Sequence, residues 1–147
     1  MGLEKFASLV PERKYLLSEE SAKLELGKLM TFYDIDLSEV SVEQEAAVGQ
    51  ILQRLLSAFR AGKLELKDDP EKGLSIIQAI RNGDTLTYRQ IRGSDKSKLG
   101  TAGDDPTRRL HYLGGILSSE GIDVIERLQA ADLKISEAVS AFFIVLC

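Results

Sequence analysis

The chain has 147 residues, of which 44% are hydrophobic and 29% charged, and these values are typical of one globular domain and exclude general disorder. Its single cysteine, Cys147, leaves no intramolecular disulfide, and its single histidine, His111, argues against a zinc site. The net charge is −4, but residues 81–111 hold seven Lys or Arg against four Asp or Glu. This local excess is smaller than the dense basic footprint of most nucleic-acid-binding proteins.

A helical hairpin is predicted over residues 18–61. Ser18 is a suitable N-cap, and apolar residues at helical spacing continue from there to about Asp34. A second helix is predicted to begin at Ser41, where the sequence SVEQ has the form of a capping box. Its continuous apolar stripe ends at Gly62, and the short connection between the helices favours antiparallel packing.

Residues 63–91 have a different pattern, which predicts a small antiparallel sheet. Leu64 and Leu66 alternate with charged residues, and Asn82-Gly83 is a two-residue hairpin signal. After it, Leu86 and Tyr88 fall on one face of a predicted strand. The intervening segment 74–80 is compatible with either strand or helix, because a short apolar run does not distinguish them.

A mobile loop is predicted over residues 92–106, since this stretch holds three glycines and a proline among polar residues. Helices are then expected from Asp105 to before Gly121, over 123–129, and from Asp132 to the end. The Gly114-Gly115 pair within the first of these indicates a close helix approach or a break. The fold class is therefore mainly α (α+β), in a single domain over 1–147 with its C-terminal helical part at 105–147.

The last helix ends in five consecutive apolar residues that point in every direction, and we expect part of this circumference to meet another chain. With the arginine pair of the helix that begins at Asp105, the expected partner-binding residues are Phe142, Phe143, Ile144, Val145, Leu146, Arg108 and Arg109. The longest apolar stretch of the chain, residues 138–147, is about half the length needed to cross a membrane, so a buried helix is the better interpretation. The N-terminus has no long apolar run after basic residues, which favours the cytoplasm.

Catalytic motifs are sparse. The sequence has no GxxxxGK[ST] phosphate loop and no GxGxxG after a strand, and we expect no cofactor and no metal ion. A small enzyme is one alternative, for which the candidate residues are Asp104, Asp105, Arg108, Arg109 and His111. A regulator that binds nucleic acid through residues 81–111 is another alternative, which the modest basic excess disfavours.

The C-terminal part also resembles a known family. From the run DTLTYRQIRGSDKSKLG, which begins at Asp84, to Phe143, the chain resembles the small tail assembly chaperones of phages and prophages. The matching positions are Leu86, Tyr88, Arg89, Leu110, Leu113, Ile125, Leu128, Asp132, Val139 and Phe143. The resemblance implies a non-enzymatic cytoplasmic protein that shields a hydrophobic or helical partner during assembly.

Together these observations predict a non-enzymatic protein–protein interaction protein. The expected partner is another protein chain, either a second copy of this one or a helical partner, and the pattern is compatible with a homo-oligomer. No nucleic acid or membrane partner is expected.

Overall fold

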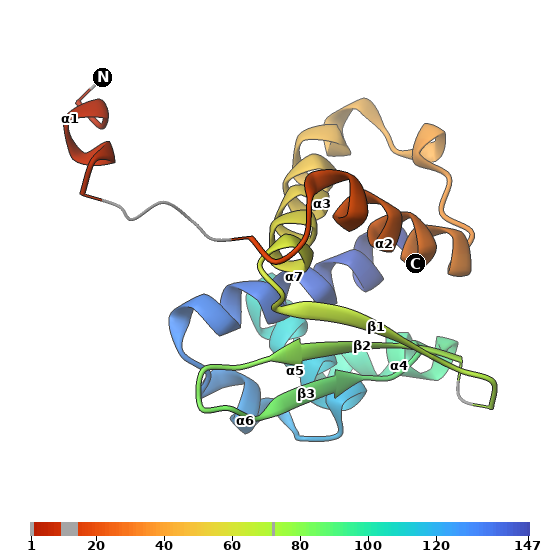
Figure 1. The fold of residues 1–147 in the computed structure, drawn as a ribbon. Helices are drawn as coiled ribbons and strands as arrows, with labels where there is room; N and C mark the ends of the chain where they lie inside the picture. The colour runs from red at the N-terminus through yellow and green to blue at the C-terminus, as the bar shows by residue number, and fades with distance from the viewer. Residues whose placement is uncertain (1, 10–14, 72) are drawn as a thin grey trace.

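The computed structural model describes residues 2–9, 15–71 and 73–147 and has an α+β fold with three parts (Figure 1). A helical hairpin lies on one side of a small sheet, and the C-terminal helices lie behind the sheet, while the short N-terminal helix α1 (Glu4–Ala7) stands away from the body. None of the helices in these ranges is long and apolar enough to cross a membrane.

The predicted hairpin consists of α2 (Glu19–Phe32) and α3 (Glu45–Arg60), which pack against each other. Ser18 caps α2 by accepting a hydrogen bond from the backbone N–H of Ser21, as expected. The second helical segment begins after Ser41, as predicted, but as a 3-10 turn, Val42–Gln44, that continues directly into α3. The predicted capping box is wrong, because the side chain of Ser41 makes no capping bond. A second 3-10 turn, Leu37–Glu39, lies within the connection.

The sheet has the order β1-β2-β3 and is antiparallel throughout, with β1 at Leu64–Asp69, β2 at Gly73–Ala79 and β3 at Thr85–Tyr88. The segment 74–80, for which the sequence left strand and helix both possible, lies mostly in strand β2. Its buried residues Leu74, Ile76 and Gln78 alternate with more exposed ones. Leu86 and Tyr88 are buried on the same face, as predicted. This face lies against the C-terminal helices.

The turn between β2 and β3 is longer than the predicted two-residue turn. The backbone N–H of Ile80 donates to the carbonyl of Asp84, so three residues, Arg81 to Gly83, lie between the paired positions. Gly83 has φ +92°, the left-handed conformation that closes a three-residue turn of this kind. The Asn82-Gly83 signal therefore predicted the position of the hairpin correctly, but the predicted loop length of two residues was wrong.

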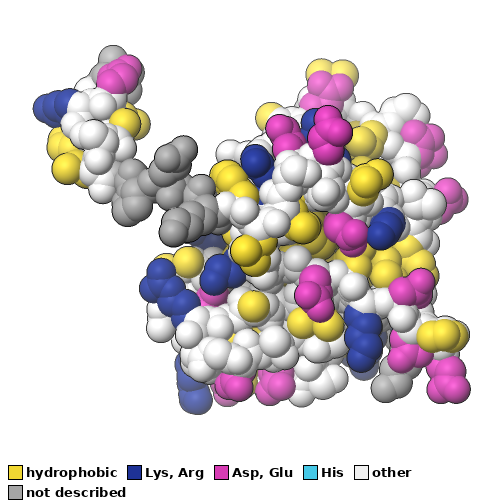
Figure 2. Space-filling view, in the orientation of Figure 1, with side chains coloured by type: hydrophobic (Ala, Val, Ile, Leu, Met, Phe, Trp, Pro, Cys, Tyr) yellow, Lys and Arg dark blue, Asp and Glu magenta, His cyan; other side chains and the backbone are white. Residues whose placement is uncertain are grey.

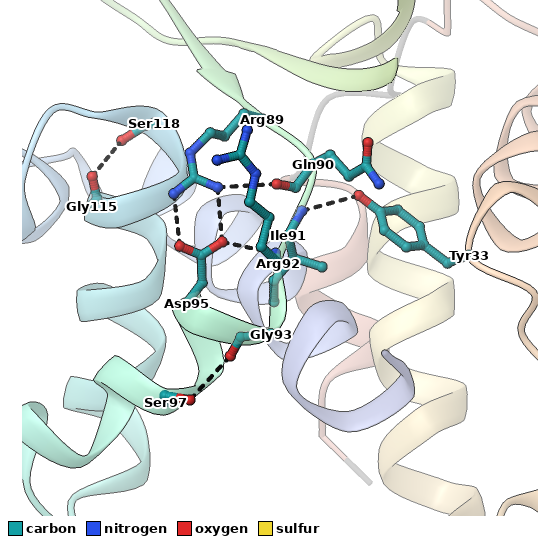
Figure 3. Close-up of polar contacts among 10 residues, drawn as sticks. All are labelled: Tyr33, Arg89, Gln90, Ile91, Arg92, Gly93, Asp95, Ser97, Gly115 and Ser118. Atoms are coloured by element: carbon teal, nitrogen blue, oxygen red, sulfur yellow. Dashed lines mark hydrogen bonds and ion pairs between the residues drawn. The ribbon is translucent and has the colours of Figure 1, made fainter. Parts of the chain in front are cut away.

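Most of the predicted loop 92–106 is helical, in α4 (Gly93–Ser97) and the 3-10 helix η3 (Lys98–Ala102). Two features account for this difference. Leu99 and Ala102 are buried, and the carboxylate of Asp95, which is 1% exposed, accepts two hydrogen bonds from the guanidinium of Arg89, at 2.7 and 2.8 Å (Figure 3). The same carboxylate accepts a bond from the backbone N–H of Arg92 and so fixes the start of α4.

The C-terminal part contains α5 (Pro106–Ser118), α6 (Ile122–Glu126) and α7 (Ala130–Leu146). Asp105 caps α5 through the backbone N–H of Thr107, as predicted. The Gly114-Gly115 pair marks a close approach, since a Cβ at Gly114 would lie 3.3 Å from the hydroxyls of Ser136 and Ser140 on α7. Helix α7 packs against both α3 and α5 and thereby joins the hairpin to the rest of the core.

Candidate partner-binding surfaces

The first two predicted partner-binding residues, Phe142 and Phe143, are core side chains, 0% and 1% exposed. Their rings make edge contacts with each other and with Tyr33, at centroid distances of 5.4 to 6.2 Å. The prediction that these two residues form a binding surface is wrong, because α2, α3 and α5 cover more of the end of α7 than the sequence indicated.

The next three predicted residues differ in exposure. Ile144 and Leu146 are partly buried and pack against the core, whereas Val145 is 41% exposed. Of the apolar end of α7, Val145 is therefore the one large side chain that is well exposed. Burial also raises the pKa of the Cys147 thiol to about 11, so it is protonated at neutral pH.

The arginine pair of α5 does not form one surface. Arg108 Nη1 lies 3.6 Å from Glu126 Oε1, whereas Arg109 Nε donates to the carbonyl of Gly103. His111, on the same helix, is buried between two carboxylates, with Nδ1 3.0 Å from Glu126 Oε2 and Nε2 2.8 Å from Glu137 Oε2. Both imidazole nitrogens are thus engaged by side chains of α6 and α7.

This arrangement separates the residues of the enzyme alternative. Asp105 is engaged as the cap of α5, and Asp104 is exposed, so neither carboxylate joins the histidine. Within the described ranges, no group of three or more His, Cys, Asp or Glu residues could hold a metal ion. Glu126 and Glu137 were missed by sequence reasoning, because they lie on two other helices, 15 and 26 residues from His111, and only the tertiary fold brings them together.

A second polar cluster is buried between the sheet and α7. Tyr88 Oη lies 2.6 Å from Gln78 Oε1 and 2.9 Å from Ser136 Oγ, and Gln78 donates to the carbonyl of Asp132. Burial, the largest effect, raises the pKa of Tyr88. The cluster joins β2, β3 and α7 in the interior, and its role is to satisfy buried polar groups.

A groove of about 890 Å³ lies where the C-terminal half of α3, the β2–β3 turn and the start of α7 meet. Its charged lining residues are Arg54, Lys63, Arg81 and Lys134, and no Asp or Glu among the described residues lines it. Lys and Arg side chains gather at the left edge of the molecule in Figure 2, where the β2–β3 turn and the start of α7 lie in Figure 1. We call this site the basic groove.

The N-terminal arm, residues 3–9, exposes three large apolar side chains. Leu3, Phe6 and Leu9 are 73%, 51% and 74% exposed. The arm contains α1 and lies clear of the body in Figures 1 and 2, where its apolar side chains are visible on the isolated helix. Sequence reasoning missed the arm, although the spacing of these three residues by three was a usable signal.

Comparisons of the chain with protein-family models, curated proteins and solved structures found no match. The surfaces that remain as candidates for binding are therefore defined by geometry: the N-terminal arm and the basic groove.

Proposed function

We propose that the protein is a non-enzymatic interaction protein that binds another protein chain through its N-terminal arm. The observation that carries this proposal is the exposure of Leu3, Phe6 and Leu9 on a segment that lies clear of the body. Large apolar side chains gathered on one exposed element are typical of a protein interaction site.

The spacing of the three side chains supports this mode of binding. Only Phe6 lies within α1. If binding extended the helix over Leu3 and Leu9, these residues at i, i+3 and i+6 would fall on one side of it, as in peptides that place an apolar helix face into a groove of a partner. A helix of four residues is far below the length that is stable alone in water, so contact with a partner would be its source of stability. Burial of each side chain would contribute about 1.5 to 3 kcal/mol.

The resemblance of residues 84–147 to tail assembly chaperones supplies a finer form of the proposal, in which the partner is a phage tail component and binding takes place in the cytoplasm. The alternative to a phage tail component is a second copy of this chain as the partner.

The proposal can be tested with a photo-crosslinking residue in place of Phe6 in the full chain, expressed in its native cells. We expect a discrete crosslinked complex with a protein, which is lost when Leu3 and Leu9 are also changed to Ser. The matched control places the crosslinker at Val42, which is exposed on the body. Sedimentation of the purified chain identifies the case in which the partner is a second copy.

Two results would overturn the proposal. One is crosslinking at position 6 that gives no discrete protein product or is unchanged by Leu3→Ser and Leu9→Ser. The other is a complex that forms equally well with the crosslinker at Val42, since binding would then not depend on the arm.

A further inference from the structure

The basic groove is a concave site formed by three segments that are distant in the sequence. Arg54 comes from α3, Lys63 precedes β1, Arg81 lies in the β2–β3 turn and Lys134 lies on α7. The turn is held against α7 by two hydrogen bonds, from the backbone N–H of Arg81 to Asp132 Oδ2 and from Arg81 Nη1 to Gln129 Oε1. The fold therefore fixes the relative positions of these cations.

These four positive charges are not neutralised by the described part of the chain. The salt bridges of Lys and Arg in those ranges involve other residues, namely Lys23, Lys28, Arg89 and Arg108. Among the described residues, the only side-chain hydrogen bond of these four cations goes from Arg81 to a neutral amide, that of Gln129. The carboxylate of Asp132 accepts a hydrogen bond from the backbone N–H of Arg81, but it is buried and does not line the groove.

We propose that the basic groove binds an acidic segment of a protein partner. This inference rests on the proposed function, because it names a second contact of the same interaction protein and the chemistry of its partner. Four unpaired cations in a chain whose net charge is −4 form a local positive potential, which attracts and orients a segment rich in Asp or Glu.

The remaining lining residues favour a peptide over other anions. The groove also presents small and apolar side chains, those of Ala58, Ala61, Ala130, Ala131 and Ile135, together with Gln53 and Ser57 as hydrogen-bonding groups. This combination suits a peptide with acidic and small apolar residues better than a free phosphate. None of its lining residues is aromatic, so it offers no stacking surface for the bases of a single-stranded nucleic acid.

The test measures fluorescence anisotropy with a labelled peptide of about twelve residues in which Glu alternates with Ala, chosen to present charge complementary to the groove. Its neutral counterpart has Gln for Glu, and an oligothymidylate is the nucleic-acid probe. The groove variant carries Arg54→Gln, Lys63→Gln, Arg81→Gln and Lys134→Gln. The charge-matched control variant carries Lys23→Gln, Lys28→Gln, Lys67→Gln and Lys96→Gln.

We expect the acidic peptide to bind the wild-type chain and the groove variant to bind it at least about tenfold more weakly, with a change of less than about threefold in the control variant. Equal losses in both variants, absence of peptide binding, or tighter groove-dependent binding of the oligothymidylate would each overturn the inference. Circular dichroism confirms that the variants are folded. Both variants keep the N-terminal arm, so failure here leaves the arm-dependent crosslink of the proposed function intact.

Discussion

His111 is buried between the carboxylates of Glu126 and Glu137, and its protonation depends on both of them. Burial lowers the pKa of His111, but the hydrogen bonds to Glu126 and Glu137 and the charges of these carboxylates outweigh this effect, and the pKa is raised above 6.5. Arg108 also lies beside this group of side chains, because it forms an ion pair with Glu126. A raised pKa in the folded state adds stability that is complete below the unfolded pKa and is lost as pH rises through the folded pKa.

The first prediction concerns this pH dependence. Between about pH 6 and about pH 8 the free energy of unfolding of the wild-type chain should fall more steeply than that of His111→Gln, in which residue 111 does not titrate. Urea unfolding at a series of pH values measures both slopes. Glu137→Gln should also flatten the wild-type slope, because it removes one of the two carboxylates that stabilise the imidazolium. Parallel curves for the wild type and His111→Gln would show that protonation of His111 between the two glutamates does not stabilise the fold.

At the scale of the elements, the glycine pair of α5 sets how closely α5 approaches its neighbours. A Cβ at Gly115 would lie 2.5 Å from the backbone carbon of Gly121 and the nitrogen of Ile122, at the start of α6. Backbone atoms cannot move aside as a flexible side chain can. A side chain at position 115 would therefore force the backbone of the turn between α5 and α6 to shift.

The second prediction compares glycines within helices. Gly115→Ala should lower the free energy of unfolding by about 1 to 3 kcal/mol, because the new methyl group overlaps packed backbone. Gly27→Ala in α2 and Gly49→Ala in α3 are matched controls, since nothing lies within 4 Å of a Cβ at either position. Each control should raise the free energy of unfolding by up to about 1 kcal/mol through higher helix propensity. Chemical denaturation of the three variants decides the matter, and a neutral Gly115→Ala would contradict the close approach.

The elements themselves were largely predictable from the sequence, because periodicity and caps are local signals. The alternation at Leu86 and Tyr88 and the cap at Ser18 were both found in the structure. The errors arose where tertiary contacts decide local structure. Asp95 gave no local indication that it would be buried against Arg89, and without that pair the glycine-rich segment after β3 resembles a loop.

The candidate binding site was less predictable than the elements. The basic groove takes its four cations from three segments that are distant in the sequence, and a sequence pattern cannot show which of the chain's 19 Lys and Arg residues converge. The sequence showed correctly that the end of α7 is apolar, but the interpretation of Phe142 and Phe143 as a partner-binding surface was wrong. Its hydrophobicity was recognised, but burial within one chain and burial by a partner give the same sequence pattern.

At the scale of the whole molecule, α7 connects the N-terminal hairpin to the C-terminal helices through its packing. It packs against α3 of the N-terminal hairpin and against α5 and α6 of the C-terminal part. Asp132 of α7 and Gln129, which directly precedes the helix, anchor the β2–β3 turn. The edge contacts of Phe142 and Phe143 with Tyr33 extend this packing to the end of α2. The hairpin and the C-terminal helices therefore share one core.

The third prediction is that damage to α7 destabilises both halves of the molecule together. Phe142→Ala should lower the free energy of unfolding by about 3 to 5 kcal/mol, because it leaves a cavity where α7 joins the other helices. Val145→Ala, at the exposed position of the same helix, should change it by less than about 1 kcal/mol. Hydrogen exchange gives the sharper measurement, because a shared core requires the slowest amides of α3 and of α5 to lose protection by the same factor in Phe142→Ala. Loss of protection confined to α5 would mean that the hairpin is stable without α7, and the chain would then consist of two units rather than one cooperative domain.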